Sequence, residues 1–405
     1  MINKYKKITH KKWIKEQQET RTRGYKQGGI YMWYSIITLL LLAFCGVGTS
    51  NSWAAPTINS VSGNINHKQI ITIVGSGYGV KSPAAPLLWD TFEQGTNGGA
   101  LSADPHWVKY NGPGSTTGGY FNNTESYSGT LSAYNRTTGP SASNPVNLHF
   151  NTSNFFFKPT DKIYYSYMSK YIVTGDSYGV LKNGRSNASP NTYNGPGDIY
   201  FSSGQSRFEK ALGQYGPIIW HSGLNSPNWT RHEIYKSNST PGVADGGVWM
   251  AIGNKVVRNE KNIVTRATGE SFKQTNIILG LMFANARNNG DHRIWIDDVY
   301  VDNTKARVEL GNAPSFTSST HREIQVPTYW SPNSINVNVN SGSFNSGEKV
   351  YLFVIDSNGN ASTGYPVTIG TGSGVAVVAP VVDPIITPVV DPTPTPPANL
   401  HITLP

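Results

Sequence analysis

The sequence has very few thiols and few charges, and both shortages exclude whole classes of protein. Cys45 is the only cysteine among 405 residues, and Asp, Glu, Lys and Arg together make up 14% of the chain. A lone thiol excludes an internal disulfide framework and zinc or iron–sulfur sites built from cysteines. So low a charge content is unusual for a helical enzyme, whereas 42 Gly, 25 Pro, 22 Tyr and 10 Trp are typical of a turn-rich β protein.

The distribution of apolar residues along the sequence also predicts no amphipathic helices. No window after residue 55 repeats apolar residues at the helical period between capping residues. Apolar and polar residues alternate instead, in runs bounded by Gly, Asn, Ser and Pro, and the two-residue turns Gly253-Asn254 and Asn358-Gly359 are typical of hairpins. The clearest runs are 70–74, 163–167, 277–283 and 350–355. We therefore expect an all-β protein.

Positive charge is concentrated at the N-terminus. Residues 1–31 hold nine Lys and Arg against two Glu, and an apolar run follows at 36–44. Small residues then lead to Ala54 and Ala55, so the segment has the basic, apolar and small-residue regions of an export signal. We expect cleavage between Ala54 and Ala55 and a protein that is secreted or displayed at the cell surface.

Removal of this segment lowers the net charge of the protein and so changes which partners that charge predicts. The remaining 351 residues (405 less 54) carry 24 basic and 22 acidic side chains (33 less nine, and 24 less two), so the formal net charge falls from +9 to +2. We therefore expect no nucleic-acid partner and no stable membrane span after signal removal. A single membrane anchor, a lipoprotein modified at Cys45, and a start at Met1 or at Met32 are the alternatives left open.

Two distant segments resemble halves of one module. Residues 56–79 end in the turn Gly75-Ser76-Gly77-Tyr78-Gly79 and resemble the opening of an IPT/TIG domain, which is an immunoglobulin-like sandwich. Matching strands reappear at 306–370, and the two parts together have the size of such a sandwich. We expect this domain to be divided into residues 55–84 and residues 305–370.

The intervening residues 85–304 are expected to form a second, inserted domain, because insertion into a loop with close ends is tolerated. This stretch opens with Asp90-Thr91-Phe92-Glu93 and closes with Ile296-Asp297-Asp298-Val299. Both ends resemble those of concanavalin/laminin-G-like jelly rolls and of carbohydrate-binding modules. The predicted fold is thus a jelly-roll sandwich inserted into an immunoglobulin-like sandwich. Residues 1–54 precede it as the export signal with its basic extension, and residues 371–405 follow as a Pro-rich tail or linker.

Carboxylates at the two ends of the inserted domain suggest a metal site. The first and last strands of a jelly roll usually pair, so Asp90 and Glu93 should approach Asp298. Hard oxygen ligands suit Ca²⁺, which would also stabilise an exported fold without disulfides. We expect a structural Ca²⁺ at Asp90, Glu93 and Asp298, with solvated strand-end acids as the alternative.

Aromatic and paired charged side chains suggest glycan contact. Successive odd positions share one face of a strand, so two strands should each present a row of such side chains. Alternating Arg and Glu are hard to explain as core, because buried charges need partners. The candidate ligand-binding residues are Tyr165, Tyr167, Arg207, Glu209, Trp220, Trp229, Arg231 and Glu233.

Catalysis is the harder question. A polysaccharide lyase must neutralise a uronate, abstract its α-proton and protonate the leaving oxygen. Suitable side chains are Arg231, His232, Glu233 and Tyr235, with His221 as a further base. The Arg-x-Glu pattern resembles the arginine strand of alginate lyases only in part, since the second Arg and a Q-[IV]-H strand are absent. The glycosidase motif E-x-D-x-x-E and the G-x-S-x-G elbow are also absent.

The leading prediction is a secreted or surface protein that binds extracellular polysaccharide, or a cell-surface glycan, through the jelly-roll domain. A polysaccharide lyase or related carbohydrate-active enzyme of concanavalin-like fold is the second reading. A non-catalytic structural or adhesion protein is the third.

Overall fold

A computed structural model describes the chain from Ala54 to Thr371 with gaps. The described residues are 54–109, 119–138, 145–148, 158–175, 177–178, 182–189, 199–202, 205–208, 219–220, 226–282, 285–286 and 290–371. The predicted export signal and the Pro-rich tail therefore lie outside the described residues, apart from their last and first positions. Within these ranges, no helix has the length and apolar character needed to cross a membrane.

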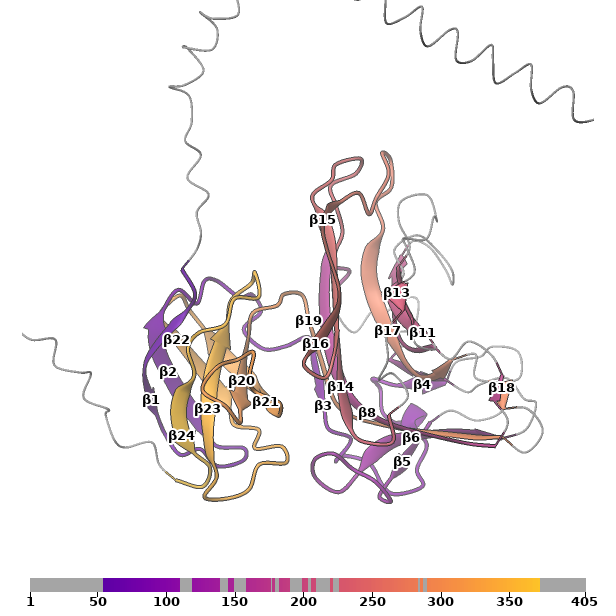
Figure 1. Ribbon diagram of the computed structural model, residues 1–405, viewed down its shortest axis with the longest axis horizontal. Helices are drawn as coiled ribbons and strands as arrows, with labels where there is room; N and C mark the ends of the chain where they lie inside the picture. Colours follow the sequence, from indigo (N-terminus) through magenta and orange to yellow (C-terminus); the bar gives the residue numbers. More distant parts are fainter. Residues whose placement is uncertain are drawn as a thin grey trace, which may run out of the picture. The chain divides into compact units, whose positions relative to one another are not determined.

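The first sandwich, here called the host sandwich, combines strands from both ends of the chain (Figure 1). Its strands follow the order β1-β2-β22-β21-β20-β23-β24, and all neighbours are antiparallel. β21 pairs with β20 through its first half and with β22 through its second half, so it belongs to both layers. The strands are β1 Thr57–Ser62, β2 Ile70–Ser76, β20 Arg307–Gly311, β21 Arg322–Trp330, β22 Ser334–Asn338, β23 Lys349–Ile355 and β24 Tyr365–Thr368.

The second sandwich, the jelly roll, is built from the chain between β2 and β20. Its interface sheet has the order β16-β15-β14-β8-β19-β6-β5, with β3 also paired to β19. Its members are β3 Leu88–Asp90, β5 Tyr120–Asn122, β6 Ser132–Thr138, β8 Lys162–Thr174, β14 Thr230–Ser237, β15 Gly246–Ile252, β16 Lys255–Ile263 and β19 Asp291–Asp302.

The opposing sheet of the jelly roll has the order β13-β12-β11-β10-β17-β7-β4. A separate two-stranded ribbon pairs β18 with β9, and among the described residues a 3₁₀ turn, η2, spans Leu101–Ala103. The opposing sheet and ribbon comprise β4 Val108–Lys109, β7 Pro145–Leu148, β9 Ser177–Tyr178, β10 Lys182–Ser189, β11 Ile199–Ser202, β12 Gln205–Phe208, β13 Ile219–Trp220, β17 Lys273–Met282 and β18 Asn285–Ala286.

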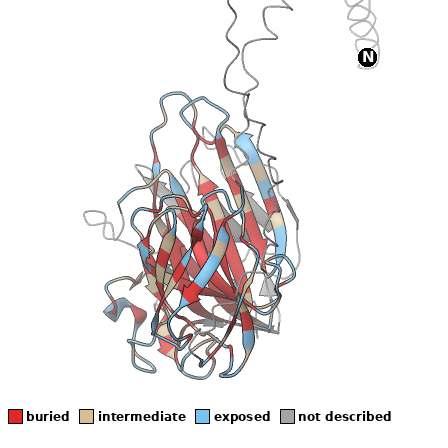
Figure 2. Cartoon of the chain, turned by 90° about the vertical axis from the view of Figure 1, so that its left-hand side faces the viewer, coloured by how far each residue is buried: buried red, intermediate tan, exposed pale blue. Residues whose placement is uncertain are grey.

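Strand alternation places the core of the jelly roll between its two sheets. Tyr165 and Tyr167 of β8 pack in one apolar cluster with Ile277 and Leu279 of β17, and all four are fully buried. The other face of β8 is buried as well, because Tyr164 packs against Ile324 of the host sandwich. The interface sheet is therefore covered on both faces along β8 and β19, most of whose residues are buried. Figure 2 shows buried strands running through the middle of the molecule.

The insertion is visible in the pairing of strands. β2 ends at Ser76, β20 begins at Arg307, and both lie in the seven-stranded host arrangement. Where the chain leaves and re-enters, Lys81 Nζ pairs with Asp302 Oδ2 at 2.8 Å, and both side chains are fully buried. The expected fold, a jelly roll inserted into an immunoglobulin-like sandwich, is confirmed, while the exact boundaries at 84–85 and 304–305 and the IPT/TIG resemblance stay predictions.

Candidate functional site

Five charged side chains form a buried ion network between the two sandwiches. Arg231 and Glu233 come from β14, Arg307 and Glu309 from β20, and Arg322 from β21. Arg231 Nη1 donates to Glu309 Oε2 at 2.8 Å, and Arg307 Nε donates to Glu309 Oε1 at 2.5 Å. Arg322 Nη2 donates to Glu233 Oε2 at 3.3 Å. Each guanidinium therefore has a carboxylate partner.

The network keeps its carboxylates ionised. Burial alone would raise the pKa of Glu309, but the charges of Arg231, Arg307 and Arg322 outweigh it and hold that pKa well below its ordinary value. The pKa of Glu233 is lowered by the same three guanidinium groups against the same effect of burial.

The structure corrects the expectation of an open polar face at Arg231 and Glu233. Alternation does place Arg231, Glu233 and Tyr235 on one face of β14, but that face packs against β20 and β21 of the host sandwich. Arg231 is 8% exposed and Glu233 is 1% exposed. The partners that these buried charges require are the host charges, so the face of β14 is no open glycan platform, although Glu233 lines a cavity beside the network.

Tyr165 and Tyr167 of β8 point into the core of the jelly roll. Tyr165 and Tyr167 stack with ring centroids 6.4 Å apart, and Tyr167 stacks on His232 at 5.1 Å with an interplanar angle of 11°. All three residues are fully buried. They are core residues, which corrects their assignment as ligand contacts. His232 also faces away from Arg231, so the predicted lyase residues of β14 do not converge.

The remaining candidates for glycan contact fall in three groups. Trp229 is half-buried, with its ring centroid 6.0 Å from that of Tyr127. Arg207 lies in β12 and Trp220 in β13, where only the backbone is described. Glu209 and His221 lie outside the described residues. Three of the eight glycan-contact candidates, and the lyase candidate His221, therefore carry no described side-chain geometry.

The predicted metal ligands do not meet. Glu93 accepts hydrogen bonds from Thr130 N and Leu131 N, both at 2.7 Å, whereas Asp298 accepts one from Ser128 Oγ at 2.6 Å. Asp90 points elsewhere, and its Oδ2 accepts the indole N–H of Trp107 at 2.6 Å. The structure therefore does not support a shared cation at Asp90, Glu93 and Asp298.

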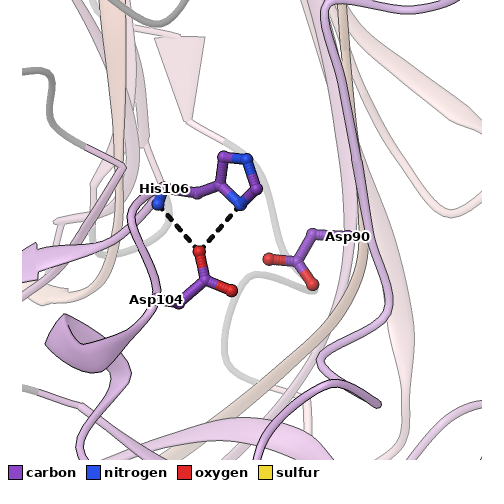
Figure 3. Close-up of side chains that lie close together, drawn as sticks. All are labelled: Asp90, Asp104 and His106. Atoms are coloured by element: carbon purple, nitrogen blue, oxygen red, sulfur yellow. Dashed lines mark hydrogen bonds and ion pairs between the residues drawn. The ribbon is translucent and has the colours of Figure 1, made fainter.

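Asp90 lies instead beside Asp104 and His106 (Figure 3). In the described part of the chain, they are the group of three His, Asp or Glu residues whose potential ligand atoms all lie within 4.8 Å of one another. Gln94 Nε2 donates to Asp90 Oδ1 at 3.0 Å and to Asp104 Oδ2 at 2.7 Å. Because both Asp90 oxygens and Asp104 Oδ2 already accept N–H groups, this cluster is satisfied as a hydrogen-bonded brace that holds Trp107.

A polar groove runs beside the ion network. Two adjoining cavities of about 310 and 290 Å³ share five lining residues from β15, β16 and the host sandwich. The shared residues are Trp249, Asn259, Lys261, Lys305 and Asn358. This groove was not predicted from the sequence. The one sequence feature that could have indicated it is the position of Trp249 in the strand before the Gly253-Asn254 turn, where successive side chains alternate between the two faces of the sheet.

Lys305 is the central cation of the groove. Its Nζ lies 4.5 Å from the ring centroid of Tyr235 and 5.1 Å from that of Trp249, so two aromatic faces hold the ammonium. Burial and the nearby charges of Arg307 and Lys261 lower the pKa of Lys305 to about 8. The groove thus combines aromatic rings, planar amides and a cation whose protonation changes near neutral pH.

Some solved structures resemble part of this chain at low identity, whereas family models and curated proteins do not match it. Among solved structures, alginate lyase Aly36B is 14% identical with a TM-score of 0.40, covering 54% of this chain and 98% of its own. Endo-β-1,4-glucuronan lyase from the fungus Trichoderma reesei is 14% identical with a TM-score of 0.36, covering 51% and 94%. The binding domain of botulinum neurotoxin serotype G is 11% identical with a TM-score of 0.32, covering 62% and 69%. These similarities are too low to transfer an activity or a site residue.

Proposed function

We propose that this protein is exported and binds an acidic, uronate-containing polysaccharide in the groove around Trp249 and Lys305, without cleaving it. The observation that carries the proposal is the composition of the groove: aromatic rings including Trp249 and Tyr235, several Asn amides, two ammonium groups and two guanidinium groups line the adjoining cavities, together with three carboxylates. Such a combination matches a sugar acid, which presents apolar CH faces, many hydroxyls and a carboxylate.

Each component of the groove has a role in this proposal. The ring of Trp249 offers an apolar surface to sugar CH groups. The amides of Asn259 and Asn358 donate and accept hydrogen bonds with hydroxyls. Lys305 and Lys261 supply positive charge for a carboxylate. This proposal retains the polysaccharide binding that the sequence predicted. It places the binding site in the groove instead of on the face of β14.

Cleavage is the less favoured reading because the lyase residues are separated. Arg231 and Glu233 are locked in the ion network, whereas His232 lies on the opposite face of the strand inside the core. Tyr235 contributes its ring to the Lys305 cage. A base, an acid and a charge-neutralising group around one uronate carbon do not occur among these four residues.

Replacing Trp249 with alanine tests the groove. We expect the affinity for polyuronates such as alginate or pectate to fall about tenfold, because the sugar loses its aromatic surface and Lys305 loses one of its two rings. Binding is measured by calorimetry, and product is monitored by the ultraviolet absorbance of unsaturated uronates.

The matched control is Tyr329→Ala, which removes an exposed aromatic side chain of the host sandwich outside the groove. This variant should bind like the unsubstituted protein. If Trp249→Ala and the unsubstituted chain bound the polyuronate with equal affinity, the groove would not be the binding site. If the unsubstituted protein increased the absorbance of unsaturated uronates, the protein would be a lyase and not a non-catalytic binding protein.

The pH dependence of binding tests the role of Lys305. Its pKa is lowered to about 8, so the ammonium is present below that pH and lost above it. We expect affinity for a polyuronate to fall roughly fivefold between about pH 7 and about pH 9, the worth of one partly exposed ion pair. Lys305→Met should bind more weakly and with a flat profile over that range. An unchanged slope in Lys305→Met would show that another group binds the carboxylate.

A further inference from the structure

A further cavity lies between the two sandwiches, and it shares no lining residue with the groove around Trp249 and Lys305, here called the polyuronate groove. Its volume is about 340 Å³, within the range of sites for small molecules. The jelly roll lines it with Trp89 of β3 and with Thr91, whereas the host sandwich contributes the turn before β2 and the end of β22. We call it the β3 cavity.

Three polar groups without a partner line the β3 cavity. Within the described residues, the indole N–H of Trp89, the hydroxyl of Thr91 and the side-chain amide of Asn338 make no hydrogen bond. All three side chains are half-buried. The carboxylate of Glu93, by contrast, already accepts the backbone N–H of Thr130 at 2.7 Å. Half-buried donors and acceptors that lack a protein partner are groups that a bound ligand can satisfy.

The charged groups at the β3 cavity balance one another. Lys68 contributes an ammonium group and Glu93 a carboxylate. Burial and the charge of Lys68 lower the pKa of His67, so this imidazole is neutral near pH 7. The polyuronate groove, in contrast, has four cationic groups against three carboxylates. The β3 cavity therefore matches a neutral ligand better than an acidic one.

Apolar side chains line the same space. Trp89 packs edge-on against Tyr300, with ring centroids 6.4 Å apart and an interplanar angle of 64°, so its ring is held in place by the jelly roll. Val326 and Val339 line the cavity from the host sandwich. An indole ring and two aliphatic side chains offer contacts to CH groups, while the unpartnered polar groups can bond hydroxyls. Sugars in their pyranose form present both kinds of group.

We propose that the β3 cavity binds a short stretch of a neutral glycan, as a second carbohydrate site separate from the polyuronate groove. Trp89 contacts the CH groups of the sugar, and Thr91 and Asn338 bond its hydroxyls. Because the lining comes from both sandwiches, the bound sugar contacts the jelly roll and the host sandwich at once. The assignment does not depend on polyuronate binding, since the two sites have no residue in common.

The test titrates the purified full chain with maltotriose, cellotriose and mannotriose in turn, by calorimetry and by saturation-transfer NMR. We expect at least one of these neutral sugars to bind. Trp89→Ala should weaken its binding about tenfold, because the sugar loses its aromatic surface, and Asn338→Ala about fivefold, because it loses one hydrogen bond. Asn338→Ala changes a half-buried polar side chain, so it tests the site even if Trp89→Ala disturbs the packing against Tyr300.

Asn336→Ala is the matched control. Asn336 lies on the same face of β22 as Asn338 and is also half-buried, but it does not line the cavity, so this variant should bind the sugar like the unsubstituted chain. Failure of all three sugars to bind the unsubstituted chain would overturn the neutral-glycan assignment. Unchanged affinity in both Trp89→Ala and Asn338→Ala would place the sugar elsewhere, and its displacement by alginate would place it in the polyuronate groove.

Discussion

Replacing Glu309 with alanine is expected to lower the free energy of unfolding by about 3–5 kcal/mol, the cost of breaking a buried ion pair by removing one partner. Glu309 is fully buried and accepts hydrogen bonds from Arg231, Arg307 and Arg322. Its loss leaves three guanidinium groups at the interface with Glu233 as their remaining network partner. Denaturant titration of the full chain measures the change as a shift in midpoint at constant slope.

Arg136→Ala provides the contrast for this prediction. Arg136 pairs with Asp291 at 2.8 Å, but its side chain is 49% exposed. An exposed pair contributes at most about 1 kcal/mol, so this variant should be nearly neutral. Equal effects of Glu309→Ala and Arg136→Ala would contradict a buried, mutually dependent network.

The same network determines how the stability of the folded protein changes at acid pH. The folded-state pKa of Glu309 and that of Glu233 are lowered, so their contribution to stability is complete above the ordinary Glu pKa of 4.5. That contribution is lost as the pH falls through the lowered folded-state values. The interface between the sandwiches should therefore weaken in acid.

Replacing Trp107 with alanine is expected to lower the free energy of unfolding by a similar amount, about 3–5 kcal/mol, because a large aromatic side chain leaves a cavity in the core. Trp107 is 1% exposed, its ring centroid lies 5.4 Å from that of Phe92, and its indole N–H is bound by Asp90. Thermal and denaturant unfolding of the full chain provide the measurement.

Trp107→Phe separates packing from the hydrogen bond. This variant keeps a ring against Phe92 but removes the indole N–H, so it should cost about 1–3 kcal/mol, less than the alanine variant. Asp90 retains the backbone N–H of Phe92 at 2.7 Å and the Gln94 amide. A loss below about 1 kcal/mol for Trp107→Ala would mean that the brace formed by Asp90, Asp104 and Gln94 does not depend on the indole.

Strands and their nesting could be predicted because they depend on local patterns. Alternation at 70–74 and 163–167 marks parts of β2 and β8, and the turn Gly253-Asn254 joins β15 to β16. The joining of the two distant halves followed from complementary strand patterns on either side of a long insert. The side-chain period and turn chemistry were sufficient for both.

The site could not be predicted because it depends on which surface covers which. Alternation correctly placed Arg231 and Glu233 on one face of β14, but only the packing of β20 and β21 decides whether that face is open. Lys305 lies in the segment between β19 and β20, where no local pattern marks it. Its aromatic neighbours, Tyr235 and Trp249, come from strands far away in the sequence.

The nesting of the two sandwiches also determines how the molecule carries mechanical load. The described chain enters at β1 and leaves after β24, which are the two ends of the host strand order. Tension applied between the two chain ends passes through the hydrogen bonds of the host sandwich while it remains folded. The jelly roll, with its groove, lies outside this force path and bears no tension until the host sandwich unfolds.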